Sequence, residues 1–186
     1  MKAVAIDAST SLVCAVLENG SVACWGSGSY GMLGNGVENN LVKPPGLTLP
    51  IGAEAIDVAT RDDGACALLV NGSVSCWGRD NSGQLGSGLV NGSQGSSTQL
   101  SLSPNYTSPL PNGKKATAIT AGYDHTCVLL EDGNVACWGS NNQGQLGLGN
   151  TSGAVSVPTL TLSLGAAATA IELSLIHISE PTRRLV

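Results

Sequence analysis

The sequence predicts an all-β protein, a partial β-propeller built from repeated four-stranded blades. Its main signal is a stretch of two short strands around a tight turn, followed by Trp-Gly and a glycine-punctuated loop. This stretch occurs at residues 14–36, 66–88 and 127–149. None of the copies shows the helical period of about 3.6 residues. A repeat of about 50 residues is typical of propellers and other repeat arrays.

Each repeat contains the material for four short strands. In the first repeat we expect strands near residues 4–7, 13–17 and 21–25, and a weaker one near 47–49 after two prolines. The equivalent residues Ile6, Val58, Ile119 and Ile171 are separated by 52, 61 and 52 positions. Four short strands per repeat make up a propeller blade.

A characteristic dipeptide marks the tight turn of each repeat. A glycine follows asparagine or aspartate each time, and these glycines are Gly20, Gly72 and Gly133. Such dipeptides tolerate positive φ and favour hairpin turns. The length of the loop stays open. A three-residue loop would place Cys14 opposite Cys24, and a two-residue loop would place Cys14 opposite Trp25.

The six cysteines form pairs that are ten positions apart in every repeat. Zinc sites usually use more closely spaced cysteines with further ligands nearby, so we predict no metal site. Cross-strand disulfides are favoured, because both members of each pair recur together. Small apolar core residues in a reducing compartment are the alternative. The disulfide candidates are Cys14 with Cys24, Cys66 with Cys76, and Cys127 with Cys137.

A tryptophan follows the second cysteine of every pair, at Trp25, Trp77 and Trp138. A large apolar side chain at one fixed place in each repeat suggests packing between neighbouring blades. We therefore expect Trp138 to lie between two blades. Trp25 belongs to the first repeat, which has no preceding neighbour in the chain.

The repeats divide the chain into consecutive units. We expect blades at residues 1–52, 53–114 and 115–166, and the start of a fourth at 167–174. The second blade has an extended segment at 89–115 that we predict to be a loop, since Ser, Gly, Asn and Pro dominate it. Such an insertion either binds a partner or has no role.

The last twelve residues depart from the repeat. Ser179 stands where a cysteine belongs, and the ending SLIHISEPTRR resembles a translated sequencing adapter. We therefore expect residues 175–186 to be non-native and leave them out of functional reasoning. At the other end, the first eleven residues lack the apolar run of a signal peptide. Either the true start lies upstream, or the protein is made without a signal.

Composition narrows the classes of function. The net charge is −5, which disfavours binding to nucleic-acid phosphates. No apolar run reaches about 18 residues, so we predict no membrane span. The pattern GSGSYG at 26–31 is a blade turn, because no helix pattern follows it. His125 has no catalytic partner in view. We predict no catalytic, cofactor-binding or metal residue, and no cofactor.

Five Asn-x-Ser/Thr sequences lie in predicted turns and loops, at Asn19, Asn71, Asn91, Asn105 and Asn150. They are compatible with a secreted glycoprotein, and they also arise by chance in a chain rich in Asn and Ser. Together with the paired cysteines they favour the secretory pathway or the extracellular space. A cytoplasmic location stays open.

The motif G-x-x-H-T-C-x-x-L-x-x-G-x-V-x-C-W-G-x-N-x-x-G-Q-L-G-x-G resembles the regulator of chromosome condensation repeat family. The third copy carries it most fully, with Gly122, His125, Thr126, Gly133, Trp138, Gly139, Gly144, Gln145, Leu146 and Gly147. The second copy has Arg61 and Gly64 in place of the first glycine and the histidine. The first copy has Ser9 and Leu12 there, and Met32 in place of the glutamine. The resemblance covers about residues 3–174.

The resemblance implies a propeller of about seven blades, of which this chain would be a fragment. It also implies a non-enzymatic scaffold for protein–protein interaction. The family includes guanine-nucleotide exchange factors for a small GTPase, so exchange activity is the alternative function and a small GTPase a possible partner. A scaffold linked to an enzyme domain is a further option. Shared blades do not choose among these or identify the partner.

Overall fold

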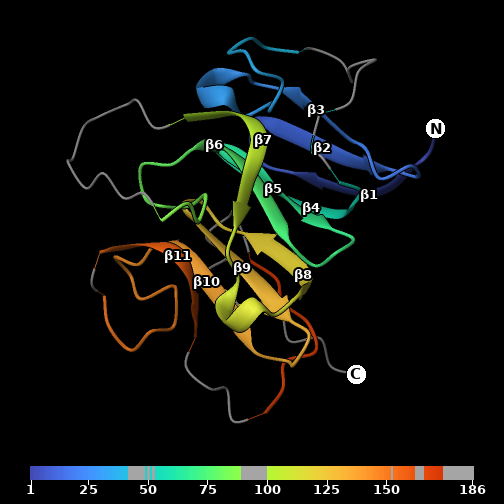
Figure 1. Cartoon of the computed structure of the whole chain (residues 1–186). Coiled ribbons are helices and arrows are strands. Elements are labelled where there is room, and N and C mark those ends of the chain that lie inside the picture. The colour runs from blue at the N-terminus through green and yellow to red at the C-terminus, as the bar shows by residue number, and fades with distance from the viewer. Residues whose placement is uncertain are drawn as a thin grey trace, which may run out of the picture.

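The computed structural model describes residues 1–41, 49, 51, 53–88, 100–151, 153–161 and 166–173. They form three antiparallel sheets that follow one another through the molecule, coloured blue, green and orange in Figure 1. Two short 3-10 turns, η1 (Ser29–Gly31) and η2 (Pro111–Gly113), are the only helical elements in this part of the chain. The prediction of an all-β partial propeller is confirmed.

The first sheet, blade 1, has the order β1-β2-β3. Its strands are β1 (Ala3–Ala8), β2 (Leu12–Leu17) and β3 (Val22–Gly26). The fourth strand expected near 47–49 lies mostly outside the described residues. Leu49 N donates to Val22 O at 2.8 Å, and Leu41 N donates to Gly26 O at 2.9 Å. Leu41 and Leu49 therefore both lie at the edge of β3, near its two ends.

All three hairpins use the longer of the two loops left open by the sequence. Leu17 N donates to Ser21 O at 2.8 Å, and Gly20 N donates to Leu17 O at 2.8 Å, which closes a three-residue loop. Cys14 consequently lies opposite Cys24 in the β2–β3 pair. The same backbone bonds close the turns of blades 2 and 3.

The second sheet, blade 2, has the order β4-β5-β6-β7. Its strands are β4 (Ala55–Arg61), β5 (Gly64–Leu69), β6 (Val74–Arg79) and β7 (Leu100–Ser108). The prediction of a loop throughout 89–115 is wrong for β7, which pairs with the edge of β6. Residues 89–99 lie outside the described part of the chain.

A proline explains why composition was misleading here. Pro104 lies where the β6–β7 register shifts, between the pairs Cys76–Tyr106 and Gly78–Ser101. A proline cannot donate a hydrogen bond, but an edge strand with a bulge tolerates it. The Pro104 carbonyl also accepts a 2.7 Å hydrogen bond from Ser75 Oγ. The residues that suggested a loop therefore belong to an irregular outer strand.

The third sheet, blade 3, has the order β11-β10-β9-β8. Its strands are β8 (Ala116–Ala121), β9 (His125–Leu130), β10 (Val135–Ser140) and β11 (Ala154–Leu160). Beyond it, residues 166–173 begin the fourth repeat, and Leu173 N donates to Thr120 Oγ1 at 2.9 Å. Each sheet falls within one predicted repeat, and the boundaries between repeats stay a prediction. The predicted non-native tail lies outside the described residues.

The apolar core lies between the blades. One cluster joins Leu12, Val16 and Val22 of blade 1 to Val58 and Trp77 of blade 2. A second joins Leu68 and Val74 of blade 2 to Ile119, Leu130 and Trp138 of blade 3. A third joins Leu146 of blade 3 to Ile171 and Leu173 of the next repeat. Because each blade buries its apolar faces on its neighbours, stability is expected to come from nearest-neighbour interfaces.

Candidate functional site

The cysteines form three disulfides, one within each hairpin. The paired Cα atoms lie 4.1, 4.0 and 4.1 Å apart, in blades 1, 2 and 3 respectively. All six side chains are buried. Each disulfide lies on the blade face that packs against the following repeat. No free cysteine occurs among the described residues.

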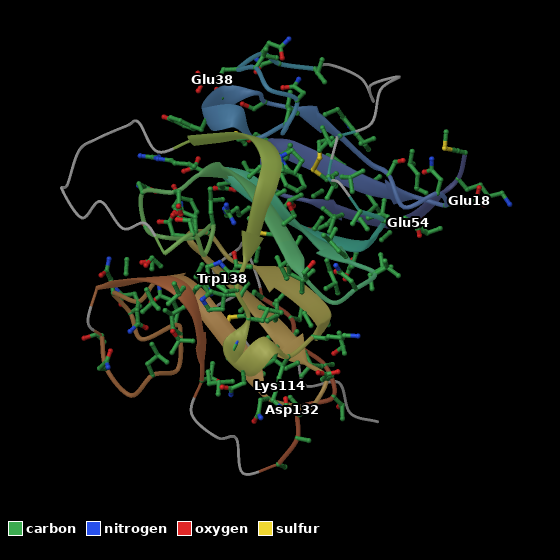
Figure 2. All side chains as sticks on the ribbon, viewed as in Figure 1. Glu18, Glu38, Glu54, Lys114, Asp132 and Trp138 are labelled. Carbon is green, nitrogen blue, oxygen red and sulfur yellow. A yellow bond between two sulfur atoms is a disulfide. The ribbon has the colours of Figure 1, made fainter. Side chains whose placement is uncertain are left out.

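The tryptophans lie on the opposite blade face, which packs against the preceding blade. Trp77 Nε1 donates to Met32 O at 2.9 Å, and Trp138 Nε1 donates to Gln84 O at 3.0 Å. Both side chains are fully buried, and Figure 2 shows Trp138 where blades 2 and 3 meet. Trp25 is only half-buried, and no described blade packs on its face. The three equivalent tryptophans therefore differ in burial according to whether a preceding blade covers them.

The turn glycines also serve the contact with the next blade. The Gly20 carbonyl accepts a 2.8 Å hydrogen bond from Ala55 N at the start of β4. Gly72 bonds Ala116 N, and Gly133 bonds Ala168 N, at 2.9 Å each. All three glycines have positive φ, and an added Cβ on any of them would overlap the next repeat. Glycine is therefore required by the conformation and by the close approach.

Arg61 is the largest departure from the repeat in the described core. Its guanidinium is fully buried at the end of β4. Nη1 donates to Gln84 O and to Thr126 Oγ1 of blade 3, both at 3.3 Å, and Nη2 donates to Trp77 O at 3.3 Å. Burial lowers the pKa of Arg61 to about 10, with nearby aspartates opposing the shift. The side chain therefore stays charged at neutral pH and joins blades 2 and 3.

Blade 3 has different residues at the positions equivalent to Arg61 and Gly64. There Gly122 and His125 take the places of Arg61 and Gly64. A Cβ on Gly122 would overlap the His125 imidazole. A Cβ on Gly64 would overlap Trp77 O and would also lie 3.2 Å from Arg61 Nη2. In each of these two blades, one of the two positions carries a large side chain and the other is glycine. Burial lowers the pKa of His125, which favours the neutral imidazole.

One edge of the blades collects the loops that differ between repeats. We call it the loop face. It consists of the loops between the first and second strands of each blade, the A–B loops at 9–11, 62–63 and 122–124. It also includes the starts of the loops between the third and fourth strands, the C–D loops, at 27–31, 79–83 and 140–144. Backbone bonds join the two sets, from Ser27 to Ser11, Arg79 to Asp63 and Ser140 to Asp124, at 2.8 to 2.9 Å. The hairpin turns at 18–20, 70–72 and 131–133 lie at the other ends of the strands, on the turn face.

The loop face carries acidic and aromatic side chains. Asp63 Oδ2 lies 3.1 Å from Arg79 Nη1, and the Arg79 guanidinium lies 4.8 Å from the centre of the Tyr30 ring in blade 1. Thr10 Oγ1 donates to Asp62 Oδ1 at 2.9 Å, which also joins blade 1 to blade 2. Tyr123 is 58% exposed. These contacts fix the position of the loops while leaving polar groups accessible.

The carboxylates of this face repel one another. Burial raises the pKa of Asp124, and the charge of Asp63 raises it further, although Arg61 and Arg79 act in the opposite direction. A cationic group from outside would relieve this repulsion. Asp80, below the surface, has a pKa raised by burial and accepts bonds from Leu85 N and Ser87 Oγ, so it stabilises its own loop.

The sequence marked the cysteines, tryptophans and turn glycines but not the loop face. In the structure the cysteines, the turn glycines, Trp77 and Trp138 lie at the boundaries between blades, whereas Trp25 does not. The acidic cluster was missed, because Asp62, Asp63 and Asp124 are adjacent only after blades 2 and 3 are side by side. The useful signal was the variation of the A–B loops within an otherwise regular repeat.

Within the described ranges, no group of three or more His, Cys, Asp or Glu side chains is placed to hold a metal ion. No helix in the described residues is long and apolar enough to cross a membrane.

The regulator of chromosome condensation (RCC1) repeat model matches residues 71–129 and 132–172, and a second RCC1 repeat model matches 116–145. The chain is 33% identical over 129 residues to the ultraviolet-B receptor UVR8 of Arabidopsis thaliana, covering 69% of this chain and 27% of the receptor. It is 33% identical over 147 residues to the E3 ubiquitin-protein ligase HERC2 of Homo sapiens, covering 79% of this chain and 3% of the ligase.

Solved structures show the same fold. Human WBSCR16 superposes with a TM-score of 0.71 at 25% identity, covering 86% of this chain and 37% of that one. Prp20p from Saccharomyces cerevisiae superposes with a TM-score of 0.69 at 20% identity, covering 86% and 38%. The chain therefore spans well under half of the proteins that it resembles.

Proposed function

Because this chain belongs to the regulator of chromosome condensation (RCC1) repeat family, we propose that it is a non-enzymatic β-propeller scaffold that binds a protein through its loop face. The observation that carries the proposal is that the repeats share their residues at the blade interfaces and differ in their A–B loops. The recurring cysteines and turn glycines, with Trp77 and Trp138, lie at the blade interfaces. The A–B loops have a different sequence in every blade. A rigid framework that presents variable loops is the usual arrangement of a binding protein.

The chemistry of the loop face favours a basic partner. Besides burial, the charges of Asp63 and Asp62 raise the pKa of Asp124, and Arg79 is already engaged with Asp63. Exposed tyrosines beside them supply flat contact area of the kind that is enriched in protein interfaces. A lysine- or arginine-rich protein segment would reduce the repulsion between the carboxylates. Complementary charge of this kind speeds association and selects partners.

Guanine-nucleotide exchange is the alternative, and it has less support. Prp20p is described with its binding properties to Gsp1p and histones. At 20% identity, the likeness to this chain concerns the fold alone. Exchange would need a segment that contacts the GTPase, for which the extension at 89–115 is the candidate, but β7 within it forms the outer edge of blade 2. A scaffold function needs no such segment.

A pair of matched variants tests the proposal. Asp62→Lys with Asp124→Lys reverses charge on the loop face, and Glu18→Lys with Glu131→Lys makes the same change of charge on the turn face. Chemical cross-linking and mass spectrometry in source cells should identify a partner retained by the wild type and the turn-face variant, and lost by the loop-face variant. Equal retention or equal loss would contradict the proposal. Accelerated release of labelled GDP from a small GTPase would favour the alternative.

A further inference from the structure

The hairpin turns of blades 1 and 2 share an acceptor sequence for a covalent modification. Asn19-Gly20-Ser21 and Asn71-Gly72-Ser73 are both Asn-x-Ser sequences at the same place in the blade. Asn19 and Asn71 are exposed on the turn face. Figure 2 labels Glu18, the residue before Asn19, at the outer tip of the first hairpin. Such a sequence on an exposed turn is an acceptor for N-glycosylation in a secreted protein.

The orientation of the two carboxamides suits the modification. Asn19 Oδ1 accepts a 3.2 Å hydrogen bond from Ser21 N, and Asn71 Oδ1 accepts one of 3.0 Å from Ser73 N. Since a backbone N–H needs an acceptor, these bonds fix which end of each carboxamide is oxygen. Nδ2 therefore points away from the turn. Within the part of the chain that the structure describes, neither Nδ2 donates a hydrogen bond.

In blade 2, the serine hydroxyl of the acceptor sequence also contacts the asparagine side chain. Ser73 Oγ donates to Asn71 Oδ1 at 2.6 Å, so the serine that completes the acceptor sequence lies against the asparagine. A sugar on Nδ2 would leave this bond and the backbone bond to Oδ1 intact. The folded turn can therefore carry a glycan without losing its own stabilising contacts.

The disulfides supply an independent indication of the compartment. Three cross-strand disulfides lie in the described residues. Disulfides persist in the secretory pathway and outside the cell, and are rare in the cytosol. Lipid-linked oligosaccharide is transferred to proteins in that same pathway. Oxidised cysteines and exposed acceptor sequences therefore indicate the same location.

We propose that Asn19 and Asn71 are attachment sites for N-linked glycans on the turn face. In the transfer, Nδ2 forms a bond to C1 of the first sugar of an oligosaccharide carried on a lipid pyrophosphate. The bond between that C1 and the pyrophosphate oxygen breaks, and the lipid pyrophosphate leaves with the electron pair. One Nδ2 proton passes to a base of the transferase. Glycans here would restrict protein partners to the loop face.

Blade 3 provides a natural control. Its turn is Asp132-Gly133-Asn134, and Asp132 Oδ1 accepts a hydrogen bond from Asn134 N at 3.2 Å, as the asparagines do in the other blades. An aspartate has no Nδ2 and cannot accept a glycan. The variants Asn19→Asp and Asn71→Asp therefore remove the acceptor nitrogen and keep the turn. Asp132→Asn together with Asn134→Ser introduces an acceptor sequence at the third turn.

The test is site occupancy in the full chain purified from its native host. Enzymatic removal of N-glycans in heavy-oxygen water converts each occupied asparagine to labelled aspartate, which peptide mass spectrometry locates. We expect the label at positions 19 and 71 only in the sample that receives the enzyme, because an Asn-Gly sequence also deamidates slowly by itself and takes up oxygen from the water. In secreted expression, each Asn→Asp variant should lose one step of the gel-mobility shift, and the blade 3 double variant should gain one. Unlabelled asparagine at both positions in the native protein, with its disulfides formed, would overturn the proposal.

Discussion

Replacing Gly72 with alanine tests whether the turn glycines are needed for contact between blades. Gly72 has a φ of +81°, and an added Cβ would overlap Lys115 Cβ and lie 2.8 Å from Lys115 Cγ. Gly113 offers a matched control, since its φ is +67° but a Cβ there meets nothing within 4 Å. Both substitutions carry the strain of a left-handed residue, about 1–2 kcal/mol. Only Gly72→Ala adds the overlap with the next blade.

The overlap sets the difference between the two variants. Forcing extra volume into a packed contact costs about 1–3 kcal/mol. Separation of the blades would also weaken the bond from Ala116 N to the Gly72 carbonyl. We therefore expect Gly72→Ala to lower the free energy of unfolding by about 1–3 kcal/mol more than Gly113→Ala does. Urea denaturation followed by circular dichroism measures both. Equal losses would refute the argument, because strain at φ alone would then account for the effect.

Three further predictions follow from the interfaces and charges. Trp138→Ala should lower the free energy of unfolding by about 3–5 kcal/mol, and Trp25→Ala by clearly less, because Trp138 alone of these two side chains is fully buried. Equal midpoints of urea denaturation would contradict this. No free thiol should titrate in denaturant, and reduction should cost about 2–3 kcal/mol per disulfide; six reactive thiols in native protein would refute it. Burial raises the pKa of Asp124, so ionisation above about pH 4 lowers stability, and Asp124→Asn should stabilise the protein at pH 7 and not at pH 3. Asp132→Asn should instead destabilise the protein at pH 7, because the hydrogen bond from Lys114 lowers the pKa of Asp132. Melting curves at pH 7 and pH 3 measure both variants, and a change of melting temperature with the same sign in both would disprove these pKa directions.

The repeated local elements could be read from the sequence because their causes are local. Turn dipeptides predicted the three hairpins, and paired cysteines predicted the cross-strand disulfides. Whether Cys14 lies opposite Cys24 depended on the length of the hairpin loop. The sequence was compatible with a loop of two residues and with one of three. Backbone bonds of the folded turn decide it in favour of three residues.

Features that depend on neighbouring strands and blades could not be read in the same way. Strand β7 looked like a loop because it contains Pro104, and only the free edge of β6 makes it a strand. Arg61 was visible as a departure from the repeat. Its burial depends on Gln84 of its own blade and on Thr126, which reaches it only after blade 3 packs against blade 2. The acidic loop face has the same origin.

Exchange of the three tryptophan indole N–H protons, followed by nuclear magnetic resonance in deuterated water, tests the blade arrangement most directly. The indoles of Trp77 and Trp138 donate to carbonyls of the preceding blade and are fully buried, so both signals should persist. The indole of Trp25 lies on a face that none of the three described blades covers, and its signal should disappear first. Three signals that exchange at the same rate would contradict the stacking of blades through their tryptophans.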